Sequence, residues 1–243
     1  MILVNNRPIL VNSRPLIISD DPAPGPTVPN DMDFLYFAKD FDGSKITNSA
    51  PNSEFGDYIK QGTLTLHGSD ASAYLTNGLT ASNYLYKDLT TAQLDSMKAI
   101  DSTYTFFIRV MQNENGTGGI ISWRNGNSYI YMIRCFQKQL QLHTTQGYNC
   151  GSDFMLDIDR VYKVVVNGSS FKAYNLDNSA EYSLTYSTNR TMTSRMTTFN
   201  ADLGSYSEAR LTKFYALAGI PRATTAEEDE IIKQCMLNQS TTI

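Results

Sequence analysis

The chain has 243 residues, of which 41% are hydrophobic, and a net charge of −4 at pH 7. This is enough for one sizeable globular domain, or a medium one with an appendage. The acidic balance gives no indication of a nucleic-acid or anionic-membrane partner, and no apolar run approaches the roughly 20 residues of a membrane-spanning helix.

The N-terminal residues and the cysteines bear on where the chain is made. Residues 1–8 have no basic start, no sustained apolar region and no small-residue cleavage site, so they do not resemble a signal peptide. Cys135, Cys150 and Cys235 form no Cys-x-x-Cys pattern and are expected to be ordinary thiols. Both features favour synthesis in cytoplasm.

Three copies of a seven-residue unit open the chain: ILVNNRP at 2–8, ILVNSRP at 9–15 and LIISDDP at 16–22. Because proline at every seventh position breaks a helix, each unit is predicted to be a short extended segment with a kink, not part of a coiled coil. A disordered tail is the alternative, but the aliphatic content is high for disordered sequence. We therefore expect an arm that docks on a partner by adding short strands to sheet edges.

The threefold unit indicates either three equivalent acceptor grooves or three chains wound together as a trimer. The arm residues expected to make the contacts are Ile2, Leu3, Val4, Arg7, Ile9, Leu10, Val11, Arg14, Leu16, Ile17 and Ile18.

A proline-rich stretch separates this arm from the rest. Four prolines lie between residues 22 and 29, which predicts a stiff, extended linker. The sequence therefore divides into an arm at 1–22, a linker at 23–30 and one domain at 31–243.

Short apolar or alternating runs separated by turn signals fill the domain. The clearest is Arg160–Tyr174, where a valine-rich run, an Asn-Gly turn and an alternating run predict a hairpin. Thr90 with Gln93, and Thr225 with Glu228, predict capping boxes of two helices, the second packing on a rim of the domain. The other strands are expected at 34–37, 62–67, 74–75, 84–86, 103–111, 120–123, 129–136, 138–143, 182–186 and 209–217.

Strands of this number, with turn signals every few residues, are typical of a sandwich. The sequence predicts an all-β, antiparallel β-sandwich or jelly roll, with an extended N-terminal arm and one or two short helices.

The order of the runs resembles a known family. YTFFIRV at 104–110 is followed by GGIISW at 118–123, then RVYKVVVNG at 160–168 and FKAY at 171–174, and ARLTKFYAL at 209–217 precedes a short acidic helix. This pattern is similar to the concanavalin A-like lectin/glucanase superfamily, and within it to laminin G-like domains. The glycine common in the family's final strand region is missing from 206–211. The resemblance implies a lectin-like sandwich, as found in sugar-binding modules, adhesive domains of viruses and bacteriophages, and enzymes.

The residues do not favour catalysis. A glucanase of this superfamily carries carboxylates on one strand face as Glu-x-Asp-x-Glu, and no such run occurs here. The acidic cluster Glu227–Glu230 lies at the start of the last predicted helix, where it complements the helix dipole. Asp153, Asp157 and Asp159 precede a strand and are expected to be turn and solvent residues. We predict that the chain is not an enzyme, with a polysaccharide-cleaving glycosidase as the alternative.

Calcium is common in the resembled superfamily. Asp40 and Asp42 precede Gly43 with a spacing that suits oxygen ligation of Ca²⁺. The Glu that would complete an EF-hand loop is missing, so a plain Asp-Gly turn is the favoured interpretation and no cofactor is expected.

Two loop segments carry the chemistry of sugar recognition, in which aromatic faces stack on rings and Asn or Arg side chains bond hydroxyls. Trp123, Arg124 and Asn125 follow one predicted strand, and Tyr148 and Asn149 lie in a later loop. The alternative is that Trp123 packs in the core and Tyr148 is an ordinary surface tyrosine.

These features together predict a bacteriophage virion protein, a head or tail fibre or decoration protein of the capsid. The arm would bind other virion proteins, and the lectin-like domain would bind host-surface glycan at the virion surface, after synthesis in the host cytoplasm. A purely architectural fibre protein without glycan binding is the second hypothesis.

Overall fold

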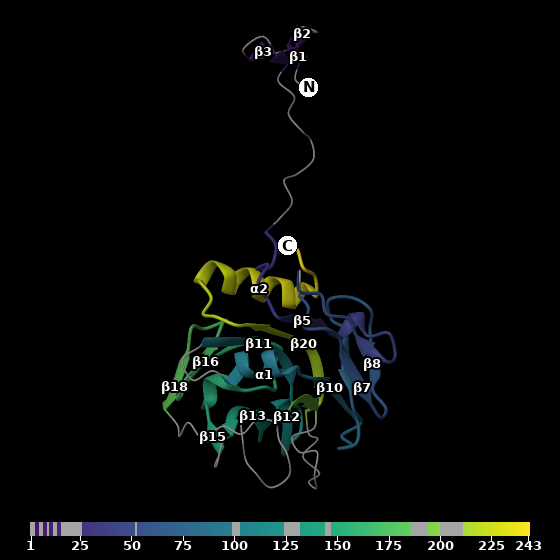
Figure 1. Cartoon of the computed structure of the whole chain (residues 1–243), viewed down its shortest axis with the longest axis vertical. Coiled ribbons are helices and arrows are strands. Elements are labelled where there is room, and N and C mark those ends of the chain that lie inside the picture. Colours follow the sequence, from purple (N-terminus) through teal and green to yellow (C-terminus); the bar gives the residue numbers. More distant parts are fainter. Residues whose placement is uncertain are drawn as a thin grey trace.

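The structure, a computed structural model, describes residues 3–4, 7–8, 10–11, 14–15, 26–51, 53–98, 103–123, 132–143, 147–185, 194–199 and 211–243. Two antiparallel β-sheets pack face to face, and a helix lies across the outer side of one of them (Figure 1). The predicted all-β sandwich is confirmed. None of the helices within the described residues is long and apolar enough to cross a membrane.

One sheet, here called the front sheet, has eight strands in the order β15-β14-β13-β12-β19-β10-β7-β6. In that order they are β15 (Gly147–Asn149), β14 (Gln139–His143), β13 (Met132–Phe136), β12 (Thr117–Ser122), β19 (Arg195–Phe199), β10 (Tyr84–Asp88), β7 (Tyr58–Gln61) and β6 (Lys45–Ile46).

The other sheet, the back sheet, runs β18-β17-β16-β11-β20-β9-β8, with β5 also paired to β20. Its strands are β18 (Glu181–Thr185), β17 (Ser170–Asn175), β16 (Val161–Asn167), β11 (Thr103–Met111), β20 (Lys213–Ile220), β9 (Tyr74–Thr76), β8 (Thr65–His67) and β5 (Phe34–Phe37). The hairpin predicted from Arg160–Tyr174 is β16 and β17, in which Asn167 pairs with Ser170 and Gly168 takes a φ of +53° in the turn.

The main hydrophobic core fills the space between the sheets. The alternate side chains of β11, among them Phe106 and Ile108, are buried in it. Phe107 points the other way, into a second core beneath a helix. Both faces of the back sheet are therefore covered at β11, which explains why apolar residues occur there at consecutive positions.

Both predicted helices form, with the predicted caps. Helix α1 (Thr91–Lys98) begins after Thr90, whose hydroxyl accepts from Gln93 N at 3.3 Å while Gln93 Oε1 accepts from Thr90 N at 2.9 Å. Helix α2 (Ala226–Asn238) has the same box between Thr225 and Glu228.

The predicted position of the last helix was wrong. Ile232, Cys235 and Met236 of α2 pack on Phe107 and Ala216, so the helix covers the outer face of the back sheet and not a rim. The reason is that β11 and β20 carry apolar residues on their outer side too, and this surface needs a partner.

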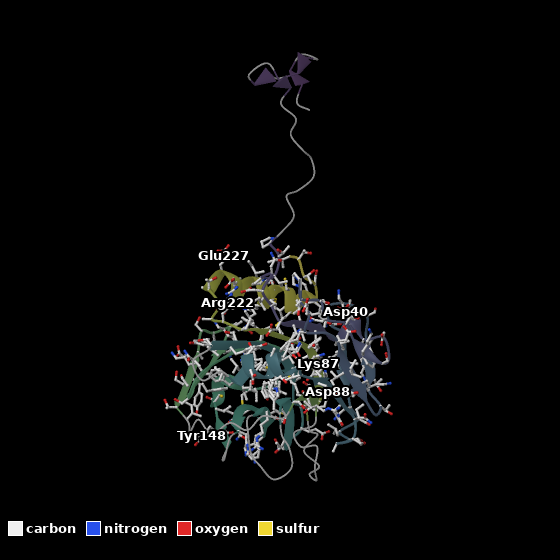
Figure 2. The ribbon with its side chains drawn as sticks, in the orientation of Figure 1. Asp40, Lys87, Asp88, Tyr148, Arg222 and Glu227 are labelled. Carbon is white, nitrogen blue, oxygen red and sulfur yellow. The ribbon has the colours of Figure 1, made fainter. Side chains whose placement is uncertain are left out.

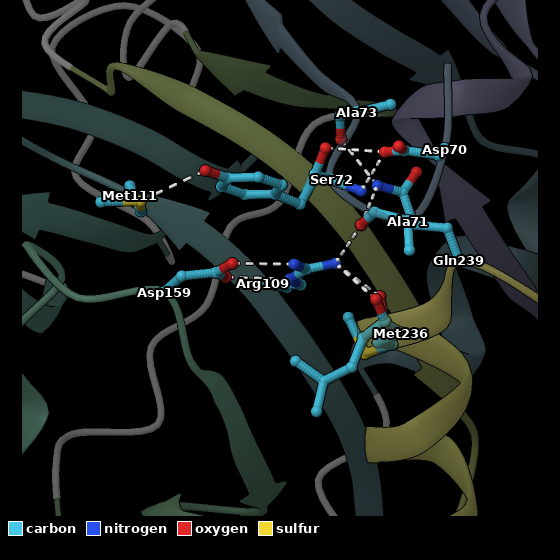
Figure 3. A network of polar contacts seen from close by, with 11 residues as sticks. Asp70, Ala71, Ser72, Ala73, Arg109, Met111, Asp159, Met236 and Gln239 are labelled. Carbon is cyan, nitrogen blue, oxygen red and sulfur yellow. Dashed lines mark hydrogen bonds and ion pairs between the residues drawn. The ribbon is translucent and has the colours of Figure 1, made fainter. Parts of the chain in front are cut away.

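A buried arginine ties the end of α2 to the sandwich (Figure 3). Arg109, on the outer side of β11, forms a bidentate ion pair with Asp159 at 2.9 and 2.8 Å. Its Nη1 also donates to the carbonyls of Ala71, Met236 and Leu237 at 3.0, 2.9 and 3.1 Å. Asp159 is exposed, as predicted, and its carboxylate also neutralises a nearly buried cation.

Gln239, the C-cap of α2, completes the junction. Its φ of +48° places it in the left-handed region, and its backbone N–H donates to carbonyls of the last helical turn. Its side-chain amide donates to Ala71 O at 3.1 Å and Ala73 O at 2.6 Å, and accepts from Lys39 N at 2.9 Å.

Two repeats of the arm pair internally with one register. Strands β1 (Leu3–Val4) and β2 (Arg7–Pro8) pair Val4 with Arg7, and β3 (Leu10–Val11) and β4 (Arg14–Pro15) pair Val11 with Arg14. The predicted extended segments are thus two-stranded hairpins with the same seven-residue period. Of the arm residues named from the sequence, Ile2, Ile9, Leu16, Ile17 and Ile18 lie outside the described residues.

The packed domain begins slightly before residue 31. Val28 is buried in the core beneath α2, its N–H donates to Thr241 O at 3.3 Å, and Thr27 bridges to Thr242. The end of the linker is therefore held against the C-terminal residues.

Candidate functional site

The first predicted sugar-binding segment does not offer its aromatic ring to solvent. Trp123 follows β12 and is 0% exposed, with its ring 5.8 Å from that of Phe106 in the main core. The expectation that Trp123 stacks on a sugar was wrong, because the indole fills the space between the sheets. Arg124 and Asn125 lie outside the described residues.

The second predicted segment is an edge strand of the front sheet. Tyr148 is half-buried and Asn149 is exposed on β15. Asn149 Oδ1 accepts from Gln141 Nε2 at 2.6 Å, and Gln141 Oε1 accepts from Arg134 Nε at 2.5 Å. Arg134, Gln141 and Asn149 therefore form a continuous chain across β13, β14 and β15, here called the amide row.

The amide row lies on the outer face of the front sheet. Ile133 and Leu142, which alternate with its members, are in the main core, so the row points away from the core. The backbone of Gly147 lies against the side chain of Gln141. A Cβ at Gly147 would be only 2.5 Å from Oε1 of Gln141. The absence of a side chain at this position is what lets the glutamine reach Asn149.

A second cluster of side chains on the same outer face is accessible to solvent and contains two tyrosines. Tyr84, Tyr86 and Asp88 alternate on β10, whose Leu85 is in the core, and β19 places Arg195 opposite Asp88. These four residues are called the tyrosine patch. Tyr84 and Tyr86 are half-buried, with ring centroids 6.2 Å apart in an edge-to-face arrangement.

The charged members of the tyrosine patch are held rigidly. Arg195 pairs with both carboxylate oxygens of Asp88, at 2.6 and 2.8 Å, and its guanidinium lies 4.2 Å from the ring centroid of Tyr86. The hydrogen bonds from Arg195 lower the pKa of Asp88, so this carboxylate is ionised over a wide pH range. The patch thus combines aromatic surface with fixed donors and acceptors.

The two groups are separate parts of one face. Strands β12 and β19 lie between β13 and β10, which sets the near members roughly 14 Å apart at normal strand spacing. Figure 2 shows Asp88 and Tyr148 toward opposite sides of the lower half of the molecule. Between them, Ser122 of β12 and Thr197 of β19 are 1% and 2% exposed, so no open surface joins the two groups.

The proposed calcium ligands have protein partners. Asp42 Oδ1 accepts from Ser44 N, Ser44 Oγ and Lys45 N at 2.8, 2.7 and 2.9 Å, and these bonds lower the pKa of Asp42 to about 2. Gly43 has a φ of +97°, which is typical of the Asp-Gly turn favoured from the sequence. Asp40 accepts from Ser49 Oγ at 3.1 Å. The described residues include no cluster of three or more His, Cys, Asp or Glu that could hold a metal ion.

The acidic start of α2 is structural, as predicted. Glu228 closes the capping box and pairs with Arg222 at 2.7 Å, and Asp229 pairs with Lys163 at 2.7 Å. Both carboxylates hold the helix to the sandwich.

Sequence reasoning missed the tyrosine patch and most of the amide row. The alternation QLQLH in β14 does place Gln141 on the polar side, so this signal was present. Arg195 had no comparable signal, since β19 was not recognised as a strand.

Comparisons with known proteins define the fold. No family model matches the chain, and no curated protein matches its sequence. Domain 4 of an extracellular arabinanase from Geobacillus stearothermophilus, solved in complex with arabinotriose, superposes with a TM-score of 0.57 at 12% identity, covering 84% of this chain and 98% of that domain.

Two further solved structures are also similar to this chain in fold. A Trypanosoma rangeli sialidase in complex with sialic acid has a TM-score of 0.59 at 9% identity, covering 89% of this chain and 36% of the sialidase. The binding domain of botulinum neurotoxin serotype D has a TM-score of 0.55 at 9% identity and 84% coverage of this chain, which spans about half, 52%, of that domain. At these identities, the likeness shows that the chain shares their β-sandwich fold.

Proposed function

We propose that this protein is a carbohydrate-binding module that holds a glycan at the tyrosine patch on the outer face of its front sheet. The observation that carries the proposal is the tyrosine patch, where two half-buried tyrosines flank a bidentate Arg195–Asp88 pair. Aromatic faces cover the apolar sides of sugar rings, and fixed charged groups orient their hydroxyls. The amide row is not part of this surface, because Arg134 and Gln141 are 8% and 3% exposed. Tyr148 pairs with the core residue Leu142, so its side chain lies on the inner side of the sheet and is not assigned to this site.

The similar structures support this assignment as analogy. One was solved with arabinotriose, another with sialic acid, and a third is a toxin binding domain. Their fold is shared by this chain, and binding by this chain is inferred from its own residues.

A binding role is favoured over hydrolysis. Among the described strands of the front sheet, Asp88 is the one Asp or Glu, and it is engaged by Arg195. A glycosidase needs two carboxyl groups across the scissile bond. Reducing-end release from host polysaccharide by the folded protein would favour the glycosidase alternative.

The test is a glycan array probed with the full-length protein and with Tyr86→Ala. We expect binding to at least one glycan class, weakened about fivefold by the substitution, because aromatic contacts of this kind contribute on the order of 1 kcal/mol. Tyr174→Ala is the matched control, because Tyr174 is also a half-buried strand tyrosine beside a cation, Lys163, but on the back sheet. A folded protein that binds no glycan, or equal binding by both variants, would contradict the proposal.

We further propose that the module is displayed on a bacteriophage particle, anchored through the arm. The two described hairpins have two-residue strands, and such hairpins are not stable alone in water, so a partner surface is expected to hold them. Mass spectrometry of purified particles, comparing the full chain with a deletion of residues 1–29, tests this. If the deletion variant is retained at full occupancy, the arm is not the anchor. A virion location with an empty glycan array would favour the purely architectural fibre.

A further inference from the structure

A cavity of about 400 Å³ shares no lining residue with the tyrosine patch or the amide row. Three segments far apart in the sequence line it: residues 30–33 ahead of β5, residues 53–55, and residues 90–93 at the start of α1. This volume is within the range of small-molecule sites. None of these segments takes part in the site proposed above.

The central group of the cavity is the carboxylate of Asp33, and its position is fixed. Asp33 Oδ2 accepts from the hydroxyl of the buried Tyr104 at 2.7 Å. The carbonyl of Asp33 accepts from Asn48 Nδ2 at 3.1 Å and from Ser53 Oγ, and its N–H donates to Gly219 O at 2.9 Å. Side chain and backbone are therefore both held from several elements.

The second carboxylate oxygen of Asp33, Oδ1, differs from Oδ2 in its hydrogen bonding. Among the described residues, no hydrogen bond reaches Oδ1 of Asp33. Burial raises the pKa of Asp33, and the nearby charge of Asp31 raises it further. Oδ1 is not among the buried polar atoms, so it is accessible from the cavity and can accept a hydrogen bond from a ligand.

The remaining walls are preorganised and mixed in polarity. Gln93 is fixed by its capping bond to Thr90 N at 2.9 Å and by donation to Phe55 O at 3.4 Å. Ala92 supplies exposed apolar surface, whereas Phe55 and Met32 line the cavity but are 3% and 2% exposed. The exposed Glu54 adds a carboxylate at the cavity. Such a wall offers mainly acceptors beside an apolar surface.

We propose that this cavity binds one neutral sugar residue, whose hydroxyls donate to Asp33 and Glu54 while its ring lies on the apolar wall. The carboxylates that accept from hydroxyls repel a sugar acid, since no Lys, Arg or His lines the described cavity. The site therefore discriminates between neutral and acidic sugars. It would be a second carbohydrate site, independent of the tyrosine patch.

The test is saturation-transfer NMR on the full-length protein. The probes are the methyl glycosides of glucose, galactose and mannose, with methyl glucuronide and methyl galacturonide as charged counterparts. We expect transfer to at least one neutral glycoside and none to the uronides. Asp33→Asn and Glu54→Gln should each weaken binding about tenfold, since a bond to a charged acceptor is replaced by one to an amide. Glu181→Gln, an exposed carboxylate on β18, is the control and should change nothing.

Tyr86→Ala separates this proposal from the previous one. If Asp33→Asn and Glu54→Gln weaken binding and Tyr86→Ala does not, the sugar binds in the cavity. This conclusion holds whether or not the tyrosine patch binds a glycan. If only Tyr86→Ala weakens binding, the sugar binds at the front sheet and the cavity proposal is overturned. Absence of transfer to every neutral glycoside, or equal transfer to uronides, also overturns it. Because Glu54 is exposed, Glu54→Gln is expected to fold. It therefore still measures the contribution of the cavity to binding if Asp33→Asn does not fold.

Discussion

Replacement of Arg109 by alanine tests how the sandwich and α2 are joined. The guanidinium bonds Asp159 twice and three carbonyls, and two of these carbonyls, Met236 and Leu237, are in the last turn of α2. Last-turn carbonyls have no partner within the helix, and a cation there also complements the helix dipole. Arg109→Ala removes all of these bonds at once.

The expected loss follows from the burial of the pair. The side chain of Arg109 is 6% exposed and that of Asp159 is 38% exposed, so water can rehydrate the carboxylate in the variant, whereas the bond to the Met236 carbonyl is buried. Breaking a buried pair costs about 3–5 kcal/mol, and exposure of Asp159 places this case at the lower end. For a domain of this size, a loss of about 3 kcal/mol lowers Tm by roughly 6–12 °C.

Thermal and urea unfolding followed by circular dichroism measure this loss, and Arg195→Ala is the matched control. Arg195 also forms a bidentate pair, with Asp88, but the two side chains are 36% and 59% exposed. Exposed pairs contribute at most about 1 kcal/mol. Hydrogen exchange should quicken at the C-terminal turn of α2 in Arg109→Ala alone. If both variants lost the same stability, burial would not be what makes the Arg109 pair important, and the reasoning above would be refuted.

Two further predictions concern packing and pH. Gly219→Ala should lower the free energy of unfolding by about 1–3 kcal/mol, because a Cβ would lie 2.5 Å from the buried ring of Phe34, and unchanged urea unfolding would contradict this. Arg222 lowers the pKa of Glu228 to about 2, so the ionised carboxylate stabilises the fold above its unfolded pKa of about 4.3, and this contribution is lost as pH falls toward 2. Urea unfolding of the native protein and of Glu228→Gln should therefore differ at pH 6 and converge by pH 2; a difference that is constant with pH would exclude this role.

The sequence by itself determined the local elements. The valine-rich hairpin at Arg160–Tyr174, the strands expected at 103–111 and 138–143, and both capping boxes depend on signals carried within about ten neighbouring residues. Because backbone propensity and side-chain alternation act locally, these predictions were confirmed. The total of such elements also fixed the all-β sandwich class.

Tertiary structure alone decided which of these elements meet. The strand β19 carries mostly polar residues and was missed, yet it lies between β12 and β10 and supplies Arg195 to Asp88, 107 positions away. The ring of Trp123 looked like a sugar platform in the sequence, but the packing of the two sheets buries it. Arg109 and Asp159 likewise meet only because β11 pairs with β16, which sets Arg109 opposite Val161. Local sequence cannot encode such contacts, because partner choice depends on register, sheet order and burial, which are properties of the whole folded chain.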